Sequence, residues 1–192
     1  MVNIKIITGS MRPGNFNSQP AHWIASLAKG RSDIEVELLD LQAINLPFLD
    51  EPAPPSQQQY TKEHTKQWSA KIAEADGFIF VTPEYNHSVS PVLKNAVDYL
   101  FLEWNYKPVT FVSYGSLAGG ARAVEHWRGI AAELKMFDLR EQVMLPNYWE
   151  NVNEKGEYAF TEQHAKSAGA MLDTLAFWGA RMKEARVALG AR

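Results

Sequence analysis

The sequence predicts an α/β fold in three layers, a five-stranded parallel sheet of strand order 2-1-3-4-5 with helices on both faces. Five strand-like runs alternate with helix-like segments, and each connection is long enough to hold the helix that parallel pairing requires. The second run alternates apolar and charged residues, as edge strands do, whereas the first, third and fourth are predominantly apolar and belong inside the sheet. Such sheets bind ligands at the carboxyl ends of their strands, between strands one and three.

The elements follow one another regularly along the chain. The predicted strands cover residues 4–8, 34–38, 77–81, 109–113 and 142–145, and the predicted helices cover 19–29, 61–75, 91–102, a stretch ending at 136, and 161–188. Asn17 or Ser18 is the expected N-cap of the first helix, and Thr161 that of the last. Residues 41–59 carry four prolines and are expected to form a packed loop without regular structure. Residues 146–160 are expected to form two short arms around a turn.

Composition limits the classes of function. The 192 residues suit one domain, and 46% hydrophobic with 21% charged residues is typical of a globular protein. A net charge of −3 without a basic block argues against nucleic acid or an anionic membrane as the main partner. The absence of cysteine excludes disulfides, thiolate nucleophiles and Fe–S clusters, so redox chemistry would need a bound cofactor. Neither a signal peptide nor a membrane span is predicted, and a cytoplasmic location is expected.

The loop after the first strand, residues 9–17, leads into a helix N-terminus and is typical of an anion site. Gly9 and Gly14 have the spacing of a nucleoside triphosphate loop, but the Lys that neutralises the terminal phosphates is missing. The dinucleotide fingerprint G-x-G-x-x-G is also missing, although Asp40 ends the second strand. The remaining side-chain donors suit a single phosphate: Ser10, Arg12, Asn15, Asn17 and Ser18. An ordinary surface loop with capping residues is the alternative.

Two further loops open on the same edge of the predicted sheet. Residues 82–86 (TPEYN) follow the third strand, and the positions of Pro83 and Asn86 predict a stiff turn that directs peptide N–H groups outward. A flat heteroaromatic ring could dock there; alternatively Tyr85 packs in the core and Glu84 is a solvated charge. The third loop includes Gly115 and Ser116 and follows the fourth strand. The three loops together predict one pocket.

Other kinds of site find little support. The five histidines are scattered without a pair at ligand spacing, so no metal site is predicted, and only His87 lies near the expected pocket. No Ser-His-Asp arrangement can be built locally, and Gly115-Ser116 is not within a G-x-S-x-G elbow. Trp104 and Tyr106 form an aromatic group that is either core or a subunit interface, and we interpret it as an interface.

Three segments together resemble the NADPH-dependent FMN reductase family, which includes azoreductases and chromate-reducing quinone reductases of flavodoxin-like fold. They are GSMRPGNFN (9–17), TPEYNHSVSPVLKNAVDYL (82–100) and EWNYKPVTFVSYGSLAGGARA (103–123). The resemblance covers most of the chain and is weakest after Pro146. Its specific part is PEYN followed by LKNA.

The resemblance implies a single flavodoxin-like FMN-binding domain over residues 1–192. It implies phosphate contacts from Ser10, Arg12, Asn15 and Asn17, ring contacts from Pro83, Glu84, Tyr85 and Asn86, and contacts beside the far side of the ring from Gly115 and Ser116. Many family members carry Ser where Asn15 stands, but Asn retains a hydrogen-bond donor.

The implied activity is hydride transfer from NADPH or NADH through bound FMN to a small acceptor: a quinone, an azo compound, free flavin or a metal oxyanion. Because both substrates would share one face of the flavin, ping-pong kinetics are expected, and no catalytic side chain is needed. The resemblance also implies a homodimer, with a tetramer as the alternative. Two rivals are a flavodoxin-like electron carrier and a nucleotide-binding enzyme without flavin. Carriers favour a strongly acidic docking surface, which a charge of −3 spread along the chain does not indicate.

Overall fold

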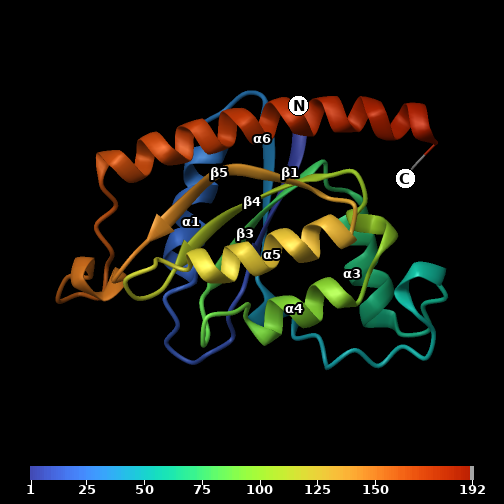
Figure 1. Cartoon of the computed structure of the whole chain (residues 1–192), viewed down its shortest axis with the longest axis horizontal. Helices are drawn as coiled ribbons and strands as arrows, with labels where there is room; N and C mark the ends of the chain where they lie inside the picture. The colour runs from blue at the N-terminus through green and yellow to red at the C-terminus, as the bar shows by residue number, and fades with distance from the viewer. Residues whose placement is uncertain (191–192) are drawn as a thin grey trace.

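A computed structural model describes residues 1–190. One parallel sheet lies at the centre of the protein (Figure 1). The strands are β1 (Val2–Thr8), β2 (Ile34–Leu39), β3 (Gly77–Pro83), β4 (Pro108–Tyr114) and β5 (Phe137–Leu145). They pair in the order β2-β1-β3-β4-β5, which confirms the predicted topology. The edge position of β2 and the complete burial of β3 and β4 agree with their sequence patterns.

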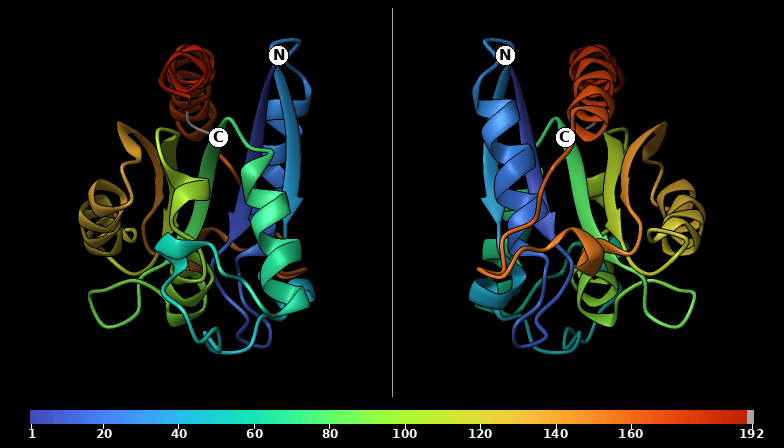
Figure 2. Two further views of the ribbon diagram at one scale, coloured as in Figure 1. Left: turned by 90° about the vertical axis from the view of Figure 1, so that its right-hand side faces the viewer. Right: turned by 90° about the vertical axis from the view of Figure 1, so that its left-hand side faces the viewer.

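Helices cover both faces of the sheet (Figure 2). They are α1 (Ser18–Lys29), α2 (Leu41–Ile44), α3 (Glu63–Ala73), α4 (Pro91–Asp98), α5 (Ala121–Glu133) and α6 (Glu162–Leu189), with three short 3-10 helices, η1 (Pro55–Gln57), η2 (Leu102–Trp104) and η3 (Tyr148–Asn151). Side chains of β1 and β3 alternate between the faces: Ile79 packs in the cluster under α1 and α6, and Phe80 packs in the cluster under α3, α4 and α5. The result is the three-layer arrangement that the sequence predicts.

Two expectations about the elements were wrong. Strand β5 begins at Phe137, five residues before the predicted start, because the polar residues in its first half lie on an edge strand that is exposed on one side. The segment 41–59 is not devoid of regular structure, because it contains α2 and η1. Asp40 starts α2 by accepting a hydrogen bond from Gln42 N (3.0 Å). Helix α2 ends before Pro47, and η1 begins with Pro55 in its first turn, where proline is tolerated.

The interpretation of Trp104 as part of an interface patch was also wrong. Its side chain is fully buried, with its ring centroid 4.8 Å from that of Phe78 and 6.4 Å from that of Trp68. Its indole Nε1 donates to Val97 O at 3.1 Å, which satisfies the polar end of the ring. Trp104 therefore belongs to the core between β3 and α3, and its neighbour Tyr106 is half-buried.

The predicted cap of the last helix and the predicted turn at its approach are confirmed. Thr161 caps α6 by accepting from His164 N, and the His164 side chain accepts from Thr161 N in return. The turn at residues 153–156 lies between two arms that join through a bridge of Val152 and Tyr158. Within residues 1–190, no helix has the length and apolar character that a bilayer crossing demands.

Candidate active site

The loop after β1 crosses the end of β3 in close contact. Gly9 N donates to Val81 O at 2.8 Å, and a Cβ on Gly9 would lie only 2.7 Å from that same oxygen. Only glycine allows this approach without a backbone shift. The Ser90 hydroxyl donates to Gly9 O from the start of α4, so the loop is tied to two neighbouring elements.

Asn17 is the N-cap of α1, as one of the two predicted candidates, but its side chain does not cap the helix. The side-chain oxygen instead accepts from Gly9 N (3.3 Å) and from the Tyr114 hydroxyl (3.4 Å) inside the protein. The side chain that usually satisfies the first-turn N–H groups is thus used elsewhere. At this end of the helix Gln19 N donates to Phe16 O (3.1 Å) and Pro20 has no N–H, so within residues 1–190 Ser18 N and the positive end of the helix dipole remain for a ligand.

Asn15 and Arg12 form the outer part of this loop. Asn15 Nδ2 donates to Arg12 O at 2.8 Å, and Asn15 Oδ1 accepts from Asn17 N at 3.0 Å. The Arg12 side chain is exposed, and no carboxylate within residues 1–190 forms an ion pair with it. A fixed loop with one unpaired guanidinium is suited to an anion.

The loop after β3 closes as a tight two-residue turn. Tyr85 and Ser88 exchange backbone hydrogen bonds of 3.1 and 3.0 Å, and the residues between them, Asn86 and His87, have φ of 49° and 67°. This is the geometry of a type I′ turn. Within the described chain the N–H groups of Asn86 and His87 have no acceptor, so they remain available to a ligand. The Tyr85 hydroxyl lies 2.9 Å from Ser10 Oγ, which joins this loop to the first one.

Glu84 is not the solvated charge that one sequence interpretation allowed. Its side chain is only 6% exposed and forms an ion pair with Arg122 from the first turn of α5. The Arg122 backbone N–H donates to the same carboxylate at 3.1 Å. Sequence reasoning did not identify Arg122, because the two residues are 38 positions apart and no local spacing connects them.

The loop after β4 completes the site with a compact turn. Ser116 O accepts from Gly119 N (2.8 Å) and from Asn147 N (3.2 Å), which ties the turn to the chain after β5. Gly120 has φ of 86°, and a Cβ there would lie 2.7 Å from Ser113 Cβ. Burial, followed by the neighbouring Tyr85, raises the pKa of the Tyr114 hydroxyl far above its usual range, so it acts as a neutral donor to Asn17.

The predicted residues gather around two adjoining cavities. One, of about 250 Å³, is lined by Arg12, Asn15, Pro83, Glu84, Tyr85, Tyr114, Gly115, Ser116, Tyr148 and Trp149. The other, of about 220 Å³, is lined by Thr8, Ser10, Gly14, Asn15, Asn17, Ser18, His22, Leu38, Asp40 and Gln42. Asn15 contributes to both, and Asn86 lines neither. Tyr148 and Trp149 were missed, because the stretch after β5 carries no recognisable motif; Tyr148 stacks on Phe16 with ring centroids 4.3 Å apart.

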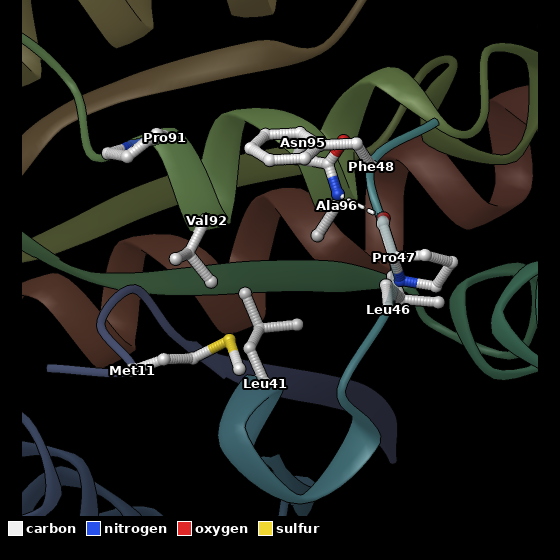
Figure 3. A pocket seen from close by; sticks show the side chains of 9 residues that line it. All are labelled: Met11, Leu41, Leu46, Pro47, Phe48, Pro91, Val92, Asn95 and Ala96. Atoms are coloured by element: carbon white, nitrogen blue, oxygen red, sulfur yellow. Dashed lines mark hydrogen bonds between the residues drawn. The ribbon is translucent and has the colours of Figure 1, made fainter. Parts of the chain in front are cut away.

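A third and larger cavity, of about 360 Å³, lies beside the first loop (Figure 3). Its lining is almost wholly apolar and includes Met11 from the loop after β1 and Val92 from α4. The one polar side chain, Asn95, is already engaged, because its amide donates to Pro47 O (2.7 Å) and accepts from Leu49 N (3.0 Å). This cavity therefore lacks the donors that the two polar cavities offer to an anion.

Comparison with known proteins identifies the family. The sequence profile of NADPH-dependent FMN reductases matches residues 2–150. The chain belongs to this family. Among its relatives is an NAD(P)H-dependent FMN reductase of Nectria sp. (ntnL), 39% identical over 152 residues that make up 76% of each chain. The 2-hydroxy-1,4-benzoquinone reductase of Burkholderia sp. is 31% identical over 187 residues, 92% of this chain and 96% of the relative.

A solved structure supports the fold of this family member. FerB, a flavoenzyme NAD(P)H:(acceptor) oxidoreductase from Paracoccus denitrificans, superposes with a TM-score of 0.76 at 20% identity, covering 95% of this chain and 99% of FerB. The chain is thus a flavodoxin-like member of an oxidoreductase family. The residues present fit FMN, the cofactor in the family name. Ser18 N at the helix N-terminus and the Arg12 guanidinium, which has no ion-pair partner within residues 1–190, match its phosphate, and the turn donors match a flat ring.

Proposed function

We propose that this protein is an FMN-dependent NAD(P)H oxidoreductase that passes hydride from NAD(P)H through bound FMN to a small acceptor by a ping-pong mechanism. The observation that carries the proposal is the meeting of an anion-binding helix N-terminus with a stiff, donor-bearing turn at the β1–β3 switch point. One FMN-binding domain over residues 1–192 would contain the whole site.

The first loop would hold the phosphate. Arg12 provides charge and a forked donor, and Ser10, Asn15 and Ser18 provide hydroxyl and amide donors around the first turn of α1. Asn17 acts indirectly by keeping its side chain turned inward, which leaves the helix N-terminus to the ligand. One guanidinium and one helix dipole can balance at most about two negative charges, which is the charge of a monophosphate.

The second and third loops would orient the ring. Pro83 and the Asn86–His87 turn fix the backbone, and Tyr85 is anchored through Ser10. Gly115 and Ser116 add two small residues to the lining of the same cavity, which also includes Tyr148 and Trp149. When bound, FMN supplies the two-electron chemistry, so the chain needs no nucleophile of its own. Its residues bind, orient and keep one side accessible to substrates.

Anaerobic addition of NADPH to the purified protein loaded with FMN tests the proposal. We expect rapid bleaching of the flavin absorbance and its return when a quinone is added. An unchanged spectrum would indicate an electron carrier, and a protein that stays colourless after FMN is supplied would indicate a nucleotide-binding enzyme without flavin. Parallel double-reciprocal plots with NADPH and quinone are expected for ping-pong kinetics, whereas intersecting plots would exclude them.

The acceptor and assembly are further parts of the proposal. The named activities of the relatives include quinone reduction, which makes a quinone the first acceptor to test, followed by azo compounds, free flavin and metal oxyanions. We propose a homodimer in the cytoplasm. Light scattering coupled to size exclusion should give a mass close to twice the chain mass of 21.6 kDa, and a mass close to four times the chain mass would indicate the tetramer.

A further inference from the structure

We propose that Arg122 is a positioning residue which, through its ion pair with Glu84, sets how strongly the protein favours reduced over oxidised FMN. The inference rests on the proposed function. Arg122 lines neither of the two polar cavities. It lies in the first turn of α5 and contacts Glu84, which lines the cavity of about 250 Å³.

The pair is held by several contacts at once. Arg122 directs its backbone N–H to Glu84 Oε2 at 3.1 Å, its Nε to Oε1 at 2.5 Å, and its Nη2 to the same oxygen. Glu84 N in turn donates to Tyr114 O at 3.2 Å, so the backbone of Glu84 is fixed as well. A forked guanidinium with these additional constraints leaves the carboxylate little freedom to move.

Burial makes the two partners unequal. The Glu84 side chain is 6% exposed, whereas that of Arg122 is 42% exposed. Water already solvates much of the guanidinium, whereas the carboxylate has little contact with water and depends on Arg122 for its counter-charge. An unpaired buried charge has a large effect on its surroundings, because the local dielectric constant is low.

The position of Arg122 on its helix supports a role beyond helix stability. A cation in the first turn opposes the helix dipole, and α5 has no acidic residue there to compensate. Gly120 is the N-cap of α5 and has no side chain to cap the first turn, and the Arg122 N–H donates to Glu84 instead. The carboxylate that lines the cavity therefore accounts for this unfavourable placement.

The charges around the cavity determine the expected sign. Glu84 contributes a negative charge, Arg122 cancels it, and Arg12 lies at another part of the lining. Two-electron reduction adds negative charge to a flavin. An uncompensated Glu84 would therefore disfavour reduction, and an uncompensated Arg122 would favour it.

The test is the midpoint potential of bound FMN in single and double variants. Relative to wild type, Arg122→Ala should lower the equilibrium constant for reduction about tenfold, a shift of about 30 mV for a two-electron couple, and Glu84→Gln should raise it. The rise in Glu84→Gln should be smaller than the fall in Arg122→Ala, because water screens the exposed guanidinium. The double variant should return close to wild type, and Arg122→Lys should restore part of the loss. Arg128→Ala is the matched control, because it removes a cation from the same helix that pairs with Asp138 instead, and the potential should stay unchanged.

A purely structural role would shift both single variants in the same direction, and that result, or no shift in either, overturns the inference. Titration of the apoproteins with FMN and thermal melting separate binding and folding from the potential. If Arg122→Ala does not fold, the near-isosteric Glu84→Gln and the Lys variant still decide the sign. A wild-type protein that binds no FMN would refute the proposed function itself, whereas a reducible wild type with the wrong signs would refute only this inference.

Discussion

Replacing Asp76 by Ala should cost far more stability than its size suggests. Asp76 follows α3 and is 3% exposed, at the sheet end opposite the candidate site. Its carboxylate accepts from Arg186 Nη2 (2.8 Å), Lys183 Nζ (2.8 Å) and Asn3 N (3.0 Å). It thereby ties the C-terminal half of α6 to β1.

The magnitude follows from the burial of the partner. The side chain of Arg186 is 8% exposed, and among residues 1–190 the guanidinium without Asp76 keeps only its bond to Tyr106 O at 3.1 Å. Burial lowers the pKa of Arg186, and the charge and hydrogen bond of Asp76 oppose this shift. Removing one partner of such a pair costs about 3–5 kcal/mol.

Urea unfolding followed by far-UV circular dichroism at pH 7 measures this loss, and thermal melting should show a decrease of roughly 6–20 °C in Tm for a chain of this length. Lys183→Ala is the control, because that partner is 54% exposed and should cost at most about 1 kcal/mol. The double variant Asp76→Ala/Arg186→Met should recover much of the stability. If Asp76→Ala costs under 1 kcal/mol, or the double variant is worse than the single one, an uncompensated buried charge is not the cause.

Three further predictions concern other parts of the molecule. Arg12→Ala should weaken FMN binding by about 10–100-fold, which is the contribution of one charge-assisted hydrogen bond. The melting temperature of the apoprotein should not change. An unchanged affinity in an FMN titration would contradict the phosphate role of Arg12. Trp104→Ala should cost about 3–5 kcal/mol at every protein concentration, whereas a loss that grows on dilution would restore the interface interpretation. Burial, with Arg186 second, lowers the pKa of Lys107 to about 7, so between about pH 7 and 10.4 the unfolded chain binds the extra proton. The free energy of unfolding should therefore rise with pH in this window by up to about 1.4 kcal/mol per unit, and Lys107→Met should lose that slope in urea titrations at several pH values.

The strand order was predictable because burial leaves a direct mark on sequence. Strand β3 is apolar at every position and lies between two neighbours, while β2 alternates and lies at an edge. The start of β5 was missed although Phe137 to Arg140 alternate apolar and charged residues as β2 does, so the edge-strand signal was present in the sequence. A register shift between Val109 and Phe111 in the neighbouring strand adds a local irregularity that has no sequence signature.

Single side chains were harder to predict than elements. The aromatic group around Trp104 contains enough apolar surface for either a core or an interface, and only the packing of Trp68 and Phe78 against it decides between them. The same limit applies to Glu84. Its sequence context allows a solvated charge, and only the arrival of Arg122 from another helix gives it a buried partner.

The positions in the candidate site that were predictable are those where a loop needs a special backbone. Asn86 was expected to accept a left-handed conformation, and it has φ of 49°. Gly9 has the close contact with Val81 O that explains its place in the motif. What the sequence could not predict is how the loops are connected to each other.

Three contacts supply that connection. Ser10 meets Tyr85 between the first two loops, Asn17 meets Tyr114 between the first loop and the end of β4, and Glu84 meets Arg122 between the second loop and α5. These hydrogen bonds and this ion pair hold the loops in place without a ligand, so a cofactor that binds there would not have to order them. An enzyme whose chemistry comes from its cofactor needs this rigidity more than it needs a reactive side chain. Under the proposed function one explanation covers two observations: no catalytic dyad is found in the sequence, and the loops are held by contacts with one another, because the cofactor reacts and the chain positions it.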